Sequence, residues 1–228
     1  MLQPALRVSE LGQCARRVLY QHQLEFQPQI APEAQRKMAL GHLIETLRRR
    51  ELRKDGIRVF GPQLEVRFES AIGHIDGYLK TAEGPVLWEC KSTSSFSIAK
   101  WHKEGLPRPI AYQVHGYMEG LSSALCEPVE RCQIEVVDRT SGEVHSWLYG
   151  LDRAVLGAAR ERAEHLARLL EQGIIPEPEY EATSSECRYC PFRITCRPEL
   201  EIPDVSQSCV DATAWPGMSE AVNLYAAG

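Results

Sequence analysis

Apolar residues recur along the chain with two different periods, which divide it into helical and extended segments. The clearest helical pattern lies between Pro32 and Lys54. Its apolar positions are Met38, Leu40, Leu43, Ile44 and Leu47, which recur at the spacing of an amphipathic helix. Pro32-Glu33 is a favourable helix start, and Gly56 follows as an end signal. The pattern therefore predicts a helix over 32–54.

Extended segments occupy the middle of the chain. The expected strands are 58–69, 73–81, 85–91, 132–138 and 144–149. Turn residues such as those at 82–84 and 140–142 separate them. Further helices are expected over 11–23, 109–121 and 152–172. From residue 32 onward the order is αβββαββα, which predicts an α/β fold with a mixed sheet flanked by helices.

Three charged residues fall on two consecutive predicted strands. Asp76 lies on one, and Glu89 and Lys91 lie two residues apart on the next. Residues two apart on a strand point to the same face, and the turn between the strands lets Asp76 lie beside Glu89. Two such carboxylates form a hard oxygen site for Mg²⁺ or Mn²⁺. Lys91 can then stabilise charge that develops on a phosphate.

The same pattern also fits an exposed strand face with an ordinary Glu–Lys ion pair, which contributes little free energy. Two neighbouring features favour a site. Residues 86–88 are apolar on both faces of the strand, so its charged end is not an ordinary exposed edge. Gly77, directly after Asp76, permits the close approach of a backbone or a ligand.

Two helical pairs add polar groups to this set. Gly41 and Glu45 are one turn apart, so we expect the helix to approach the sheet closely at Gly41 and to present Glu45 as a third carboxylate. Gln113 and Tyr117 share a face of the helix over 109–121. An amide and a phenol there can hold a nucleotide phosphate or the lysine. A solvated Glu45 and an ordinary packed Tyr117 are the alternatives.

Four motifs occur in this order along the chain: Gly41 with Glu45, Gly73 with Asp76 and Gly77, Glu89 with Lys91, and Gln113 with Tyr117. Together they resemble the PD-(D/E)xK nuclease superfamily, and most of all its RecB-like branch with a Q-x-x-x-Y motif. The resemblance implies a restriction-endonuclease-like fold and hydrolysis of DNA phosphodiesters. The catalytic set it implies is Glu45, Asp76, Glu89, Lys91, Gln113 and Tyr117. The Mg²⁺ or Mn²⁺ ligands it implies are Asp76, Glu89, the backbone carbonyl of Cys90, and Glu45.

One position departs from that branch. Many of its members carry a ligand histidine directly before the helical glutamate, where this chain has Ile44. His42 lies about 200° around the helix from Ile44, which makes it a poor substitute. The number and type of catalytic metal ions therefore stay open.

The chain has eight cysteines. It shows neither a secretory h-region nor an apolar run near the ~20 residues of a membrane span, so we expect a cytoplasmic location without a membrane partner. Disulfides are rare in that compartment. The cysteines are then expected either to bind metal or to pack as small apolar side chains.

Cys187, Cys190 and Cys196 form a C-x2-C-x5-C motif in a proline-rich tail, and a metal site normally takes four ligands. Cys14 lies in a segment that resembles the N-terminal C-x-R-R motif of RecB-like nucleases with a [4Fe–4S] cluster. These include CRISPR-associated exonucleases and AddB-type helicase–nucleases. The resemblance implies a cluster that joins the N- and C-terminal segments, although zinc suits the same thiolates. The remaining cysteines, Cys90, Cys126, Cys132 and Cys209, are interpreted as packed thiols.

We expect a single nuclease domain over 1–200, with the core at 33–173, cluster segments at 9–20 and 184–198, and a tail at 201–228. The net charge of -5 excludes a protein coated in positive charge, such as a histone-like binder. Arg16 and Arg17 are candidates for contacts with DNA phosphates, and Trp101 and Tyr117 are candidates for stacking on bases.

The expected function is a metal-dependent DNA exonuclease that acts on DNA ends or single strands. Recombination, repair or CRISPR adaptation would be its setting, and proteins of those processes its partners. Two alternatives come from other classes. One is a catalytically weak or inactive DNA-end-binding module that keeps the fold and the cluster. The other is a zinc-binding interaction protein.

Overall fold

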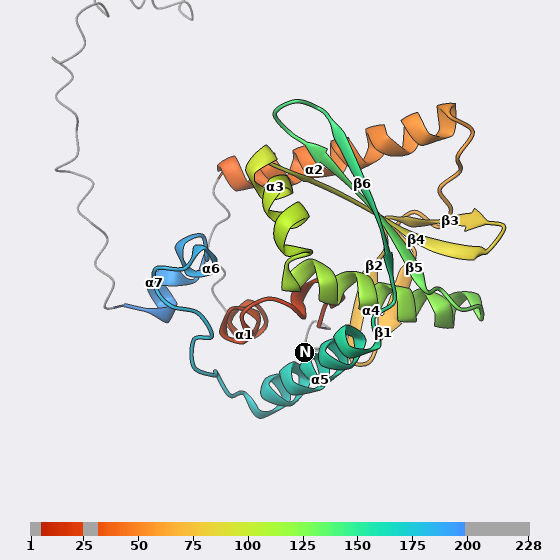
Figure 1. The fold of residues 1–228 in the computed structure, drawn as a ribbon. Coiled ribbons are helices and arrows are strands. Elements are labelled where there is room, and N and C mark those ends of the chain that lie inside the picture. The colour runs from red at the N-terminus through yellow and green to blue at the C-terminus, as the bar shows by residue number, and fades with distance from the viewer. Residues whose placement is uncertain (1–5, 25–31, 199–228) are drawn as a thin grey trace, which may run out of the picture.

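The computed structural model describes residues 6–24 and 32–198. The N-terminal part contains η1 (Val8–Glu10), α1 (Ala15–Gln23) and α2 (Pro32–Lys54). The strands are β1 (Glu65–Phe68), β2 (Ala71–His74), β3 (Gly77–Thr81), β4 (Gly84–Thr93), β5 (Arg131–Asp138) and β6 (Val144–Gly150). The remaining helices are α3 (Ser95–Glu104), α4 (Arg108–Leu125), α5 (Arg153–Gln172), α6 (Ser185–Arg188) and α7 (Arg193–Cys196). Figure 1 shows their arrangement.

A four-stranded mixed sheet in the order β3-β4-β5-β6 forms the centre of the fold. β3 and β4 form an antiparallel hairpin, β4 and β5 pair in parallel, and β5 and β6 pair antiparallel. A parallel pair needs a crossover, and the chain makes it through α3 and α4. β1 and β2 form a separate hairpin. The mixed α/β fold with helices on the sheet is confirmed.

The two faces of the sheet pack against different helices. Alternate residues of the central strands, such as Leu87, Ile134 and Val136, belong to the main core, together with residues of α1, α4 and α5. On the other face, Val86 and Trp88 of β4 form a smaller cluster with Leu52 of α2. Because β4 is covered on both faces, its apolar run is continuous and does not alternate with polar residues.

The N-terminal segment is fixed to the body by two arginines, Arg162 and Arg108, that bind its carbonyl oxygens. Arg162 of α5 donates hydrogen bonds to the carbonyl oxygens of Leu11 (3.2 Å) and Gln13 (2.8 Å). Arg108 of α4 donates to the carbonyl of Gly12 at 3.1 Å. On the opposite side of α1, Tyr20 contacts Phe192 with 5.6 Å between ring centroids. Residues remote in sequence, before α1 and after α5, are thereby brought together.

The helix over 32–54 is confirmed, but its apolar positions do not form its buried face. Met38, Leu40, Leu43 and Leu47 are exposed, with only Ile44 partly buried. The helix turns a polar side toward the sheet, where Arg48 donates hydrogen bonds to the buried Glu135 at 3.1 and 3.2 Å. The expected core face was wrong because the sheet surface under α2 carries carboxylates, and these attract the charged side of the helix.

The predicted strand over 73–81 is in fact two strands. β2 pairs with β1 and ends at His74, whereas β3 starts at Gly77 and pairs with β4. Gly77 has a φ of 151°, and a Cβ there would lie 2.3 Å from Cγ1 of Val59 and 2.9 Å from the carbonyl oxygen of Phe60. The close backbone approach expected at Gly77 is thus confirmed. The chain passes from one sheet to the other at Asp76.

Other boundaries differ from the prediction. The strand over 58–69 is reduced to β1, although Phe60 forms an isolated bridge with Tyr78. The helix α3 was not predicted, since its sequence lacks a clear apolar period. It begins at an N-cap, Ser94, whose side chain accepts a hydrogen bond from the Ser97 amide. Among the described helices, none is both long and apolar enough to cross a membrane. The tail at 201–228, including Cys209, lies outside the described residues.

Candidate active site

The carboxylates of Asp76 and Glu89 meet where β3 and β4 begin to pair. Gly77 is opposite Trp88 in the hairpin, so the residues one step further, Asp76 and Glu89, are neighbours. The backbone N–H of Cys90 donates a hydrogen bond to Oδ2 of Asp76 at 2.9 Å. Glu89 is 1% exposed, because β4 is an inner strand of the sheet. The expected position of Asp76 beside Glu89 is confirmed.

Lys91 and Gln113 both bind one oxygen of Glu89. Nζ of Lys91 lies 2.5 Å from Oε1 of Glu89, and Nε2 of Gln113 donates to the same oxygen at 3.1 Å. The other oxygen, Oε2, is buried and has no hydrogen-bond partner among the described residues. A buried carboxylate oxygen without a donor is costly, and a cation at that position would remove the cost.

Tyr117 lies on the same side of the sheet, one turn of α4 beyond Gln113. A Cβ on Gly73 would lie 2.4 Å from Cε1 of Tyr117, so the glycine makes room for the ring. Tyr117 is 4% exposed. Burial, followed by the charge of Glu89, raises the pKa of Tyr117 to about 12. The phenol therefore keeps its proton at neutral pH and lies close to Glu89, Lys91 and Gln113, away from solvent.

Glu45 reaches the site from α2. It is buried, with Oε1 at 3.1 Å from a guanidinium nitrogen of Arg49 and at 3.4 Å from Nε2 of Gln63. A solvated Glu45 is thereby excluded. The close helix approach expected at Gly41 is wrong, because a Cβ there would have nothing within 4 Å. Gly41 instead borders open space in front of the carboxylates.

That open space is a cavity of about 450 Å³, whose lining includes Gly41, His42, Glu45, Asp76 and Lys91. His42 was expected to be a poor substitute for a ligand histidine at position 44, yet it borders the cavity. The informative comparison was with Glu45, since residues three apart lie on one side of a helix. The cavity gives solvent and ligands access to a set of carboxylates that are otherwise buried.

Burial and mutual repulsion disfavour the charged forms of these carboxylates. Burial, and next the charge of Asp76, raise the pKa of Glu89 to about 7. Burial also raises the pKa of Asp76. The pKa of Glu45 is raised by burial and, next, by the charge of Asp76. Burial alone would lower the pKa of Lys91, but the charges of Glu89 and Asp76 outweigh it and hold the pKa above its ordinary value. Lys91 therefore stays cationic at neutral pH.

The site suits a hard divalent cation. Asp76 and Glu89 supply carboxylate oxygens, and Oε2 of Glu89 has no donor among the described residues. Within 6–24 and 32–198, no three side chains of His, Cys, Asp or Glu are close enough to hold a metal ion by themselves. Mg²⁺ is commonly held by only one or two carboxylates and keeps several waters, so the donor set fits such an ion.

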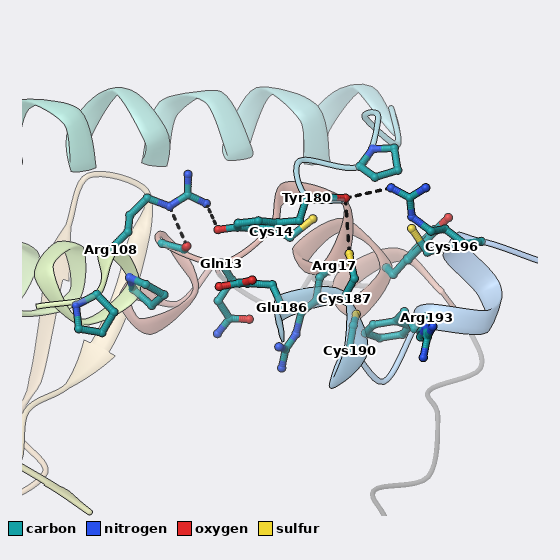
Figure 2. A pocket seen from close by; sticks show the side chains of 17 residues that line it. Gln13, Cys14, Arg17, Arg108, Tyr180, Glu186, Cys187, Cys190, Arg193 and Cys196 are labelled. Carbon is teal, nitrogen blue, oxygen red and sulfur yellow. Dashed lines mark hydrogen bonds between the residues drawn. The ribbon is translucent and has the colours of Figure 1, made fainter. Parts of the chain in front are cut away.

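The four cysteines singled out in the sequence line a second cavity, of about 220 Å³. Figure 2 shows Cys14 of the N-terminal segment facing Cys187, Cys190 and Cys196 of the tail. All four are partly buried free thiols. The remaining described cysteines lie elsewhere: Cys90 and Cys132 are buried in the sheet, and Cys126 is exposed at the end of α4.

Basic residues surround this second cavity. Arg17 and Arg193 line it, and the Nε–H of each is buried without an acceptor among the described residues. Burial raises the pKa of Cys196, and the charge of Arg16 opposes that rise. Arg16 also donates a hydrogen bond to the Tyr20 hydroxyl at 3.1 Å. Arg16 thus binds Tyr20 within α1, and Arg17 faces the cysteine cavity. Trp101 is partly buried against the main core.

The raised carboxylate pKa predicts how the stability of the metal-free protein depends on pH. Glu89 binds its proton more tightly in the folded state than in the unfolded state, so its contribution is present at pH 5 and is lost as pH rises through about 7. Thermal unfolding in EDTA should show Tm falling between about pH 5 and pH 8. The slope should be shallower in Glu89→Gln and unchanged in Glu104→Gln, an exposed residue paired with Lys100. Equal slopes in all three proteins would contradict the burial of Glu89.

Added Mg²⁺ gives the complementary result in the same titration. Because the ion binds ionised carboxylates, it must displace the proton from Glu89 at lower pH. The increase in Tm on adding Mg²⁺ should therefore be larger at pH 8 than at pH 5.5.

Solved structures with a similar fold support the architecture. The protein SSO0001 superposes with a TM-score of 0.51 at 17% sequence identity, covering 86% of this chain and 87% of that one. LHK-Exo, an alkaline exonuclease from Laribacter hongkongensis, gives a TM-score of 0.53 at 14% identity, covering 74% of this chain and 89% of that one. Its complex with dAMP gives a TM-score of 0.54 with the same identity and coverage. At such identities the likeness concerns the fold alone.

Sequence comparison gives the family directly. No curated protein matches the chain. A model of the PD-(D/E)XK nuclease superfamily, however, matches residues 3–197, a range that includes both cavities and the whole central sheet. The chain therefore belongs to the PD-(D/E)XK nuclease superfamily and is a phosphodiester hydrolase.

Proposed function

We propose that the chain is a metal-dependent deoxyribonuclease of the RecB-like branch that degrades DNA from ends or as single strands. One observation carries the proposal: the buried Glu89 holds Lys91 and Gln113 on one oxygen and leaves the other without a donor beside Asp76. A merely structural ion pair would not require an unsatisfied buried oxygen. The intact set also weighs against a catalytically inactive DNA-end-binding module.

Asp76, Glu89 and the Cys90 carbonyl would hold Mg²⁺ or Mn²⁺ in this site. The bound ion would supply an activated water and stabilise the departing oxygen of the phosphodiester. The hydrogen bond from the Cys90 N–H fixes Asp76, and Gln113 fixes Glu89. The protein groups thus hold the oxygen ligands in place before any ion or substrate arrives, which lowers the reorganisation needed for catalysis.

Lys91 acts as a fixed positive charge. Its raised pKa means that it does not take a proton from water at neutral pH. Held against Glu89, the ammonium can donate a hydrogen bond to the attacking water or to a non-bridging phosphate oxygen, where negative charge develops. Glu45 adds negative charge close to Asp76 and is positioned by Arg49. Its role is to strengthen cation binding from the α2 side.

The proposed action on DNA ends is supported by one relative in fold. LHK-Exo is described as an alkaline exonuclease, and it was crystallised with dAMP. The pKa of Glu89, raised to about 7, favours activity at neutral to alkaline pH, because a divalent cation binds the ionised form of the carboxylate. Recombination, repair and CRISPR adaptation are processes that use such an activity.

Replacing the central residues should abolish cleavage without abolishing folding. Asp76→Asn, Glu89→Gln and Lys91→Ala should each lower the rate of cleavage by at least ~10²-fold, since each removes a cation ligand or a stabilising charge. The assay is release of labelled nucleotides from end-labelled single- and double-stranded DNA with Mg²⁺ or Mn²⁺. Glu104→Gln, an exposed control, should cleave normally. Near-normal cleavage by Asp76→Asn would refute the site.

We further propose that Cys14, Cys187, Cys190 and Cys196 hold a [4Fe–4S] cluster. A single zinc ion at about 2.3 Å from each sulfur would bring the sulfurs within roughly 4 Å of one another. The thiols here surround a cavity of about 220 Å³, which suits a larger group. A four-thiolate cluster is anionic and carries sulfide acceptors, and the buried Nε–H groups of Arg17 and Arg193 would then have acceptors. When bound, the cluster would cross-link the N-terminal segment to the tail.

Metal analysis of protein purified without oxygen tests this second proposal. Wild type should contain about four irons and absorb in the visible range. Cys14→Ser should lose the iron together with part of its thermal stability, because the cross-link closes a very long loop. Cys126→Ser, at an exposed thiol, is the matched control and should keep both. One zinc and no iron in wild type, or full iron in Cys14→Ser, would refute the assignment.

A further inference from the structure

A strongly basic groove, distinct from the cysteine cavity, follows the active-site cavity along α2. Arg49, Arg50 and Arg53 line it from the helix, and Arg58 lines it from the loop that follows. The groove has a volume of about 590 Å³, and no acidic residue is among the described residues that line it. The chain as a whole has a net charge of -5, so this concentration of positive charge does not follow from its composition.

Most of this charge is not used inside the protein. Arg50, Arg53 and Arg58 are exposed, and none forms a salt bridge with a described carboxylate. By contrast, Arg48 on the sheet side of α2 binds Glu51 and Glu135. A cation in the last turn stabilises the helix dipole, which accounts for Arg53 but not for Arg50 or Arg58. The exposed guanidinium groups are thus available to an external anion.

An aromatic pair lies in the same groove. Phe60 lines the groove and stacks on Tyr78 with 5.7 Å between the ring centroids. The Arg58 guanidinium lies 4.8 Å and the Lys80 ammonium 4.9 Å from the centre of the Phe60 ring. Basic side chains interleaved with an aromatic ring are typical of grooves that bind single-stranded nucleic acid, where phosphates pair with arginines and bases stack on rings.

The groove and the active site are consecutive along one helix. Gly41, His42 and Glu45 border the catalytic cavity, and the next turns, from Thr46 to Arg53, border the groove. The Glu45–Arg49 ion pair lies between them at 3.1 Å. From Glu45 to Arg53 the helix rises about 12 Å, so one strand of DNA can contact both the groove and the catalytic cavity.

We propose that this groove binds the backbone of the substrate strand next to the bond that is cut. Phosphates pair with Arg50, Arg53 and Arg58, and a base stacks at Phe60. The position of the cut bond rests on the proposed function, but binding in the groove does not. This assignment replaces Arg16, Arg17 and Trp101 as the principal DNA contacts, since the arginines face the cysteine cavity and α1 and the tryptophan packs on the core.

Binding of a fluorescein-labelled 20-nucleotide oligo(dT) tests the proposal, with Ca²⁺ in place of Mg²⁺ to prevent cleavage. Arg50→Ala/Arg53→Ala should raise the Kd at least ~10-fold and reduce the slope of log K against log salt by roughly 1.4, about 0.7 for each lost phosphate contact. The matched control is Arg153→Ala/Arg168→Ala, which removes the same charge from exposed positions of α5. The control should bind as wild type does, and Tm values should show that all three proteins are folded.

The outcomes separate this inference from the proposed function. Loss of binding in the groove variant alone supports the groove, even if wild type does not cleave DNA with Mg²⁺ or Mn²⁺. Cleavage by wild type, combined with equal Kd and salt slope in the groove variant, overturns the groove and leaves the catalytic proposal standing. Failure of wild type to bind the oligonucleotide, or equal weakening in both double variants, also overturns the groove.

Discussion

The burial of the Glu89 carboxylate is the constraint on which the rest of the site depends. A carboxylate removed from water is strongly destabilised unless other groups compensate it. In this protein Lys91 and Gln113 satisfy one oxygen, while Asp76 lies close enough to raise the pKa further. The fold thus tolerates an unfavourable free energy of desolvation at Glu89 within a well-packed sheet. Such strained electrostatics are typical of functional sites, and a divalent cation is the group that would relieve them.

The change of sheet at Asp76 creates this constraint. Because β2 and β3 belong to different sheets, Asp76 lies between the two strand ladders, and its carboxylate accepts a hydrogen bond from the Cys90 N–H of β4. Gly77 makes the change possible by letting Val59 and Phe60 approach its backbone. The same approach places the loop of residues 56–62 beside α2 and so forms one wall of the basic groove. A single backbone feature therefore positions both the Asp76 carboxylate and the arginine groove.

Patterns of short range were sufficient to predict the strand that carries Glu89 and Lys91. The two-residue period of β4 places Glu89 and Lys91 on one face, and the tight turn after β3 sets their register with Asp76. In the same way, the helical period of α4 predicts that Gln113 and Tyr117 lie on one face of the helix. The expectation that Cys14 lies near Cys187, Cys190 and Cys196 is also met, although it came from resemblance to a family and not from local geometry.

What sequence alone missed depends on contacts between distant elements. The apolar positions of α2 suggested the wrong buried face, because the helix responds to carboxylates on the sheet, such as Glu135, that no helical period reveals. The arginines at 49–58 were overlooked for a similar reason. Their charge becomes a groove only when the loop after α2 folds back against β3, through the bridge between Phe60 and Tyr78. The absence of a close contact at Gly41 likewise depends on how α2 is tilted over the sheet.

The most direct test of this account is to locate the cation. Crystals grown with Mn²⁺ and measured at the manganese absorption edge would show its position by anomalous scattering. We expect a peak bounded by Asp76, Glu89 and the Cys90 carbonyl, at coordination distances of about 2.1 Å, with Oε2 of Glu89 among the ligands. A peak elsewhere, or none at a saturating Mn²⁺ concentration, would contradict the claim that the buried, partly unsatisfied Glu89 exists to bind the catalytic metal.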